Sequence, residues 1–281
     1  MKLSIKGSQS YNKIEHICQY FTDPTISVTG DIDISKMNEL VLSEFWPEAI
    51  APTQIVKDDR DIKDRANSII KYYVGDLKDK SFLDFGCGNG SCVRAAESVA
   101  KVSVGYDVVR HPSWNASCTD DIDAIKAHAP YNVILLYDVF DHIPEEKVDS
   151  AFNLLRSLCN EKTVLKMRCH PFTSIHGGHL YQKLNKAYAH LFLDDKTAEP
   201  YVDGFTRRIQ RPLFTYRDTV QKNGFIIKRD EIIKSAISDN VASIIKSPEI
   251  VKHIYHLFNA DPAWVDYILP IEFVDYTIGL G

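Results

Sequence analysis

The stretch Phe82-Leu-Asp-Phe-Gly-Cys-Gly-Asn-Gly90 decides the fold. Its apolar start, Ser81–Phe85, predicts a short strand, and the residues from Gly90 to Val99 predict a helix. Between them lie three glycines at alternate positions, and glycine permits backbone angles closed to other residues and leaves room for a ligand against the main chain. A strand, a glycine turn and a helix in this order predict a ligand site, although such turns also serve NAD, FAD and phosphate sites.

Strands and helices alternate on both sides of this turn. Further strands are predicted at Val102–Tyr106, Val133–Tyr137, Thr163–Met167, Phe225–Ile233 and Ile271–Ile278. Further helices are predicted at Asp61–Tyr73, near Ile122–His128 and from Glu145 to Leu158, after Pro144. This alternation predicts an α/β fold with a mostly parallel, Rossmann-like sheet.

Two long stretches do not fit a minimal sheet-and-helix plan. Residues 171–213 and 235–269 exceed the usual loops of α/β units, so we expect insertions with helices of their own. Both follow strands whose carboxyl ends face the ligand edge of the sheet, which makes them candidates for a substrate lid. Residues 1–60 show no sustained period and are interpreted as an N-terminal extension that packs on a domain spanning 61–281.

Composition narrows the class of protein. The chain has 281 residues, 44% of them hydrophobic, and a net charge of −5, which suits one large domain and gives no overall basic field for a nucleic acid. We expect a cytoplasmic protein with no membrane partner, because neither a signal peptide nor a run of ~18 apolar residues is evident. The six cysteines show no CxxC pairing and are expected to be reduced.

Two acidic residues discriminate between cofactors. Asp84 precedes the glycines inside the strand, where it would repel a pyrophosphate but suits a ligand with a positively charged amino group. Asp107 ends the next strand, where its two oxygens can accept hydrogen bonds from both ribose hydroxyls. Asp121-Ile122 can offer the adenine an acceptor, an amide donor and an apolar wall. These positions favour S-adenosylmethionine (SAM) over a dinucleotide.

The segments FLDFGCGNG, GYD, TDDID and ILLYDVFDHIP, in order between Phe82 and Pro144, resemble the motif series of class I SAM-dependent methyltransferases. The resemblance implies a seven-stranded, mostly parallel sheet with helices on both faces and an antiparallel last strand. It also implies SAM as cofactor, held by Asp84, Gly86, Cys87, Gly88, Gly90, Asp107, Val108, Asp121, Ile122 and Tyr137.

Catalytic candidates follow the later strands. Asp138, Lys166 and Glu272, with Lys63 on an earlier helix, resemble the Lys-Asp-Lys-Glu tetrad of RNA ribose 2′-O-methyltransferases. Lys71 is an alternative to Lys63. A buried strand lysine needs carboxylate partners, which would also shift its pKa. In the competing interpretation Lys166 reaches solvent and Glu272 is a solvated strand end. The phrase YDVFDHIP departs from the tetrad enzymes and is similar to small-molecule methyltransferases.

The polar segment 168–181 carries three histidines. His170 is a candidate base or acceptor-orienting group because imidazole titrates near neutrality. Loop packing is an equal alternative. His170, His176 and His179 together form a weak zinc pattern without a thiolate or carboxylate in fixed register, so we predict no metal.

The methyl acceptor stays open between RNA and a small molecule. Basic and aromatic residues alternate in Lys183, Lys186, Arg207, Arg208, Arg211, Arg217, Tyr181, Tyr188, Phe205 and Tyr216. They form either a surface for phosphates and bases or the outer face of a lid helix with inward aromatics. We expect methyl transfer to an oxygen or nitrogen nucleophile. The alternatives are an idle methyltransferase fold in a structural role and a nucleotide-dependent dehydrogenase.

Overall fold

The computed structural model describes residues 34–44, 46–50, 58–172, 174–175, 177–202, 213–234 and 271–281. The chain divides into two compact units, each described by itself. The sheet unit comprises Val56–His170, Phe214–Ile232 and Phe273–Gly281, and the accessory unit comprises Met1–Ile55, Pro171–Leu213 and Ile233–Glu272.

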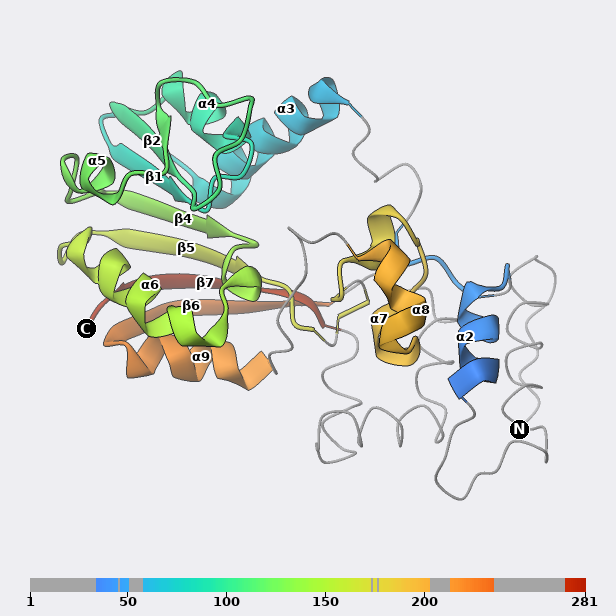
Figure 1. Cartoon of the computed structure of the whole chain (residues 1–281). Coiled ribbons are helices and arrows are strands. Elements are labelled where there is room, and N and C mark those ends of the chain that lie inside the picture. The colour runs from blue at the N-terminus through green and yellow to red at the C-terminus, as the bar shows by residue number, and fades with distance from the viewer. Residues whose placement is uncertain are drawn as a thin grey trace. The chain divides into compact units, whose positions relative to one another are not determined.

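The sheet unit is built on seven strands (Figure 1). They are β1 (Ser81–Phe85), β2 (Val102–Tyr106), β3 (Cys118–Thr119), β4 (Val133–Tyr137), β5 (Val164–Cys169), β6 (Phe225–Lys234) and β7 (Ile271–Leu280). Their order is β3-β2-β1-β4-β5-β7-β6, with β1 to β5 parallel and β7 antiparallel to β5. The predicted seven-stranded, mostly parallel sheet with an antiparallel last strand is confirmed.

Helices cover both faces of this sheet (Figure 1). One face carries α3 (Asp59–Ser68), the π-helical turn η2 (Ile69–Val74) and α4 (Ser91–Glu97); α5 (Ile122–Lys126) packs near β2 and β3. The other face carries the short η3 (Phe140–His142), α6 (Glu145–Ser157) and α9 (Leu213–Lys222).

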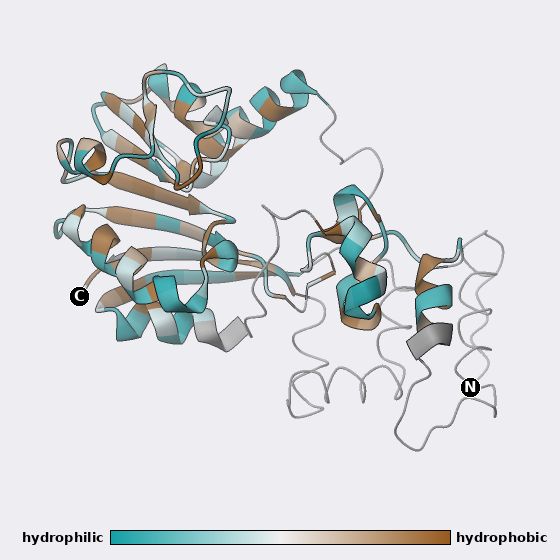
Figure 2. Ribbon diagram, in the orientation of Figure 1, coloured by the Kyte–Doolittle hydropathy of each residue, from teal (hydrophilic) through white to brown (hydrophobic). Residues whose placement is uncertain are grey.

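The core explains why these elements form. The central strand β4, Val-Ile-Leu-Leu-Tyr, is apolar throughout, as expected for a parallel strand covered on both faces, and Figure 2 shows it as hydrophobic. In α6 the buried residues Val148, Phe152 and Leu155 recur at helical spacing. Phe152 packs edge-on against Phe140 and Phe225, which ties α6 to η3 and β6.

Three details differ from the sequence-based expectation. The helix predicted over Asp61–Tyr73 starts earlier, because Asp58 caps it by accepting from the amides of Arg60 and Asp61, and it changes to π geometry at Ile69. The two-residue strand β3 and the helix α9 were not predicted, since neither shows a long period.

The accessory unit joins the N-terminal region to the first predicted insertion. Its described elements are α2 (Ile34–Leu42), η4 (Leu180–Gln182), α7 (Ala189–Phe192), α8 (Asp195–Ala198) and η5 (Glu199–Tyr201). Trp46 is buried there, donates from Nε1 to the Ala187 carbonyl at 2.7 Å and packs edge-on against Phe192. The second predicted insertion, 235–269, lies outside the described residues. No helix in the described part of the chain is both long and apolar enough to cross a membrane.

Candidate functional site

The carboxyl ends of four parallel strands place the predicted site residues along one edge of the sheet. Gly86 directly follows β1, Asp107 follows β2, Asp138 follows β4 and His170 follows β5. In open α/β sheets this edge is where ligands bind, at the point where strand order reverses, here between β1 and β4. All four residues belong to the sheet unit.

The glycine turn divides into a packed part and an open part. Gly86, Gly88 and Gly90 all have positive φ angles, of 83°, 51° and 74°. A Cβ on Gly86 would lie 2.5 Å from a methyl carbon of Val139, whereas a Cβ on Gly88 would meet nothing within 4 Å. Gly86 is therefore needed for packing, and Gly88 leaves the main chain open to a ligand.

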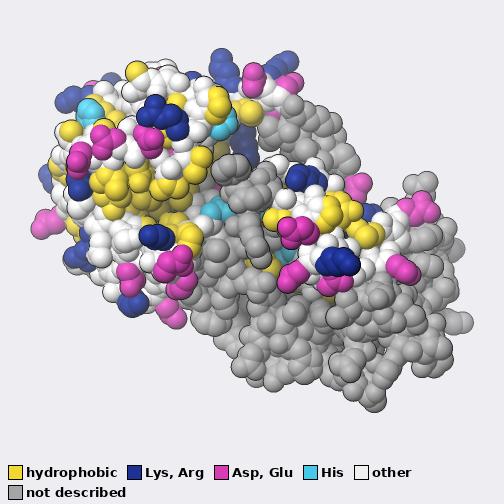
Figure 3. Space-filling model, in the orientation of Figure 1, with side chains coloured by type: hydrophobic (Ala, Val, Ile, Leu, Met, Phe, Trp, Pro, Cys, Tyr) yellow, Lys and Arg dark blue, Asp and Glu magenta, His cyan; other side chains and the backbone are white. Residues whose placement is uncertain are grey.

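Asp107 is held against this open part of the turn. Its Oδ2 accepts from the Gly88 amide at 2.9 Å and its Oδ1 accepts from the Val109 amide at 3.2 Å. Two neighbouring apolar residues are exposed, Val108 by 78% and Ile122 by 39%. Hydrophobic side chains are visible at the surface of the sheet unit in Figure 3. An acidic group beside exposed apolar side chains suits the ribose and adenine of a nucleoside.

Two predicted cofactor residues have structural partners of their own. Asp121 caps α5, since its Oδ1 accepts from the Asp123 amide at 2.8 Å. Cys87 is buried, and a hydrogen bond with the Cys118 thiol, followed by burial, raises the pKa of the Cys87 thiol. Cys87 is thus a packed thiol, and its backbone amide and carbonyl bond to the Tyr106 carbonyl and the Gly90 amide.

Asp84 is the carboxyl group that a bound cation would stabilise. Its side chain is buried at 4% exposure, and it has no hydrogen bond within the described part of the chain. Burial, followed by the nearby Cys118 and Asp107, raises the pKa of Asp84 to about 8. A buried carboxyl group without a counter-ion is costly when ionised, so the site fits a ligand that brings a positive charge, such as the amino acid end of SAM.

Three side chains that bond to the carbonyl groups of the glycine turn were not predicted from the sequence. Trp114 donates from its indole nitrogen to the Gly88 carbonyl at 2.7 Å. Arg94 and Ser113 both donate to the Asn89 carbonyl, at 2.9 Å and 2.8 Å. These three side chains come from α4 and from the segment between β2 and β3, and no short motif would identify them. They fix the turn by holding the carbonyl groups of Gly88 and Asn89.

The second part of the site is an acid–imidazole pair. His170 Nε2 lies 3.0 Å from Asp138 Oδ1, and Arg65 approaches the other oxygen of Asp138 at 3.6 Å. The backbone amide of His170 donates to the buried Asp141 at 2.8 Å. Asp138 has a φ of 58°, an uncommon conformation for a non-glycine residue that clusters at functional sites. Arg65 and Asp141 were not predicted, because their contacts depend on the fold.

An ion pair supports this region from the sheet. Arg168 binds Asp275 in a two-pronged arrangement, at 2.7 Å and 2.6 Å, and donates to the hydroxyl of Tyr137 at 2.6 Å. Its guanidinium also lies 3.7 Å from the ring centre of Phe273. The hydroxyl of Tyr137, a predicted cofactor residue, is thereby engaged with the sheet.

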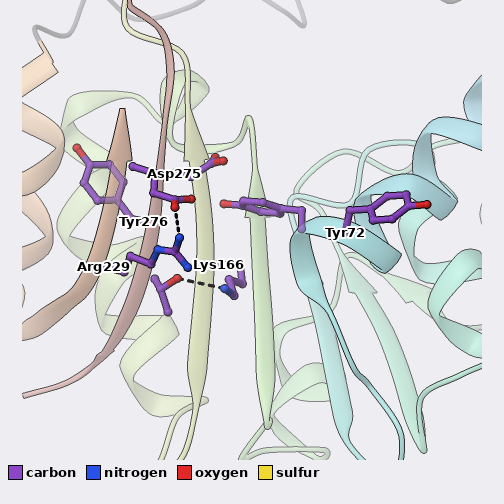
Figure 4. Close-up of a pocket in the computed structure, with 8 residues that line it drawn as sticks. Tyr72, Lys166, Arg229, Asp275 and Tyr276 are labelled. Atoms are coloured by element: carbon purple, nitrogen blue, oxygen red, sulfur yellow. Dashed lines mark hydrogen bonds and ion pairs between the residues drawn. The ribbon is translucent and has the colours of Figure 1, made fainter. Parts of the chain in front are cut away.

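The predicted Lys-Asp-Lys-Glu tetrad does not come together in the described contacts. Lys63 is exposed on α3, and Arg65 of the same helix contacts Asp138 instead. Lys166 donates to Thr277 of β7 at 3.1 Å (Figure 4). Glu272 lies five residues before Thr277 on β7, so it is not the strand neighbour of Lys166. The described contacts join Lys166 to Thr277, and Asp138 to His170 and Arg65, and the tetrad stays a prediction.

Of the other two histidines in this segment, His179 has a local contact. His179 lies with its Nε2 3.3 Å from the Tyr181 hydroxyl, and His176 lies outside the described residues. Among the residues that the structure describes, no group of three His, Cys, Asp or Glu side chains could hold a metal ion.

The basic and aromatic residues are partly engaged as well. Lys186 donates to the carbonyls of Ser43 and Trp46, and Lys183 donates to the Val202 carbonyl. The other described members are Arg217, which pairs with Asp230, the buried Tyr188 and Tyr216, and the partly buried Tyr181. Arg207, Arg208, Arg211 and Phe205 lie outside the described residues. The described aromatics thus point inward, as in the lid-helix interpretation.

Comparison with known proteins gives one family match. Residues 59–193 match a family model described as "Methyltransferase domain". A search of curated proteins gives no match.

Several solved structures are similar in fold. A SAM-dependent methyltransferase from Archaeoglobus fulgidus is 17% identical over 80% of this chain and 95% of that chain, with a TM-score of 0.49. One from Mesorhizobium loti is 15% identical over 77% and 99%, with a TM-score of 0.44. A 1,6-didemethyltoxoflavin-N1-methyltransferase from Burkholderia thailandensis is 9% identical over 100% and 93%, with a TM-score of 0.43. At these values the likeness says nothing of the methyl acceptor.

Proposed function

We propose that this chain, whose residues 59–193 carry a class I, SAM-dependent methyltransferase domain, moves the methyl group of SAM to an oxygen or nitrogen of a small molecule. The family match and the sheet order confirm the resemblance predicted from the motifs. The observation that carries the proposal is the contact between Asp138 and His170 at the edge of the sheet that also holds the glycine turn.

The sheet unit offers a group for each part of SAM. Ionised Asp84 would balance the charge of the amino acid end, and the open main chain at Gly88 would lie against the ligand. Asp107 would accept from the ribose hydroxyls, with Val108 and Ile122 beside the adenine. When bound, SAM supplies a methyl group already activated by its sulfonium, so the protein has to align an acceptor and remove its proton.

His170 is proposed as the group that removes this proton. If the ring hydrogen of His170 sits on Nε2, the nitrogen 3.0 Å from Asp138 Oδ1, Nδ1 keeps the lone pair that can accept a proton. The carboxylate of Asp138 then stabilises the imidazolium that forms, as in other acid–imidazole pairs. The bond from the His170 amide to Asp141 fixes the backbone of the base.

A small-molecule acceptor is favoured over RNA by the same contacts. Lys166 of the RNA-type tetrad donates to Thr277, and the described lysines of the basic segment donate to backbone carbonyls. The net charge of −5 provides no general attraction for a polyanion.

Two measurements test the proposal. Titration calorimetry with S-adenosylhomocysteine (SAH) should show binding, and a screen with isotopically labelled SAM should find an acceptor among small alcohols, phenols and amines but not among capped RNAs. With that acceptor, His170→Gln should lower kcat by about 100-fold or more with SAH affinity unchanged. The exposed His128→Gln is the matched control. Methylation of RNA, or full activity in His170→Gln, would contradict the proposal; SAH binding without any transfer would favour a structural role.

A further inference from the structure

The sheet face that carries α3 and η2 changes from apolar to polar beyond β4. On β5 the alternate residues Leu165, Met167 and Cys169 are buried, whereas Lys166 and Arg168 are only partly buried. A cavity of about 130 Å³ lies on this polar part. It is lined by Tyr72, Tyr73, Lys166, Arg229, Glu231, Asp275, Tyr276 and Thr277 (Figure 4), all within the sheet unit.

The charges in this cavity are not all balanced. Asp275 is engaged by Arg168, and Glu231 is engaged by Arg229. Lys166 has no carboxylate partner among the described residues; its one hydrogen bond goes to the Thr277 hydroxyl at 3.1 Å. Figure 4 shows this bond across the two strands. A half-buried ammonium group has two further protons to donate, and it is stabilised by an anion.

A second donor in the cavity lacks a partner. The hydroxyl of Tyr73 is buried and makes no hydrogen bond within the described part of the chain. Leaving such a buried hydroxyl unpaired is destabilising, so a ligand that accepts from it is favoured. Burial, followed by the charge of Asp275, raises the pKa of Tyr73, so the hydroxyl keeps its proton and remains a donor. Tyr73 belongs to η2, and π-helical turns occur frequently at functional sites.

The cavity is separate from the proposed methyl-transfer site. Lys166 precedes His170 by four strand positions, or about 13 Å at ~3.3 Å per residue. Its side chain bonds to Thr277 of β7, whereas the ring of Tyr73, on the other side of the cavity, packs edge-on against Tyr137 of β4. A ligand held by Lys166 would therefore lie several residues along β5 from the acid–imidazole pair.

We propose that this cavity binds a small oxyanion, a phosphate or carboxylate group, between Lys166, Thr277 and the hydroxyl of Tyr73. Its volume is similar to that of an engineered protein cavity of about 150 Å³ that admits benzene, so one such group fits and a nucleotide does not. The ammonium group supplies charge, and the hydroxyls of Tyr73 and Thr277 supply direction.

The test is a titration of the full chain with inorganic phosphate, and separately with acetate, at constant ionic strength set by chloride. Calorimetry and thermal melting should show saturable binding of at least one oxyanion. Lys166→Met, which keeps the length of the side chain, and Tyr73→Phe, which removes one oxygen atom, should each weaken it about tenfold or more. Lys162→Met, an exposed lysine just before β5, loses the same charge and should bind as the wild type does.

Binding that is absent in the wild type, or equal in all four proteins, would overturn the proposal. A melting curve without ligand shows whether each variant is folded. If Lys166→Met does not fold, Tyr73→Phe alone tests the proposal, because it removes one hydroxyl group and leaves the net charge and the aromatic ring unchanged. Neither result depends on methyl transfer, so failure here is distinguishable from failure of the proposed function.

Discussion

Lowering the pH from 7.5 to 6 is expected to weaken the binding of SAH by protonating Asp84. The pKa of this buried carboxyl group is raised to about 8, first by burial and then by Cys118 and Asp107. In the free protein the group is therefore mostly protonated at neutral pH. The ligand brings a positive amino group, so the complex requires the ionised form and the proton must leave on binding.

The magnitude follows from the linkage between the two equilibria. If only the ionised form binds, the dissociation constant rises about 25-fold between pH 7.5 and pH 6, and about 0.9 of a proton is released per ligand at pH 7. Calorimetry in two buffers of different ionisation enthalpy measures this proton directly. The pH window lies below the titration of the ligand's own amine, which keeps that group charged throughout.

Two matched variants test whether Asp84 causes the pH dependence of SAH binding. Asp84→Asn should bind SAH weakly, with an affinity that does not change with pH. Asp218 is an exposed carboxyl group on α9, so Asp218→Asn should keep both the SAH affinity of the wild type and its dependence on pH. An affinity that is flat between pH 6 and 7.5, with no proton exchanged, would refute the assignment of Asp84 as the counter-ion of the cofactor.

Four further variants test the cofactor site. Asp107→Ala should weaken SAH binding about 10- to 100-fold, since it removes charged acceptors for the ribose; unchanged calorimetry would contradict this. Trp114→Phe removes the indole donor to Gly88 and should weaken SAH binding about fivefold at little cost in melting temperature. Gly86→Ala should destabilise the protein by about 2–4 kcal/mol in urea unfolding, because its Cβ meets Val139. Gly88→Ala, with open space around the Cβ, should cost only about 1 kcal/mol yet weaken SAH binding; equal stability losses would count against this division of the turn.

The strands could be predicted from the sequence because their signal is local. The apolar runs Ser81–Phe85, Val102–Tyr106 and Val133–Tyr137 coincide with β1, β2 and β4. Each is followed by a glycine or an aspartate that the motif order identified. The π-helical turn could not be predicted, since its residues also satisfy an ordinary helical period.

The catalytic side chains were harder to predict because they depend on register. Asp138 and His170 follow neighbouring strands, so their proximity is a consequence of the parallel order of β4 and β5. Lys166 was grouped with Asp138 in the sequence, and the parallel register of β4 and β5 pairs it with Leu135, three positions before Asp138. A role that depends on two residues facing each other across neighbouring strands can be predicted only when the order and register of the strands are known. Neither can be derived from the sequence alone.

The position of β7 between β5 and β6 has a consequence for biosynthesis. β6 is made before β7, with residues 235–270 between them, yet it reaches the sheet only through β7. A ribosome-bound chain that has emerged as far as Lys234 would expose the hydrogen-bonding edge of β5, and such edges invite pairing with other chains. The polar side chains of β6, among them Arg229, Asp230 and Glu231, would keep this waiting strand soluble until β7 arrives.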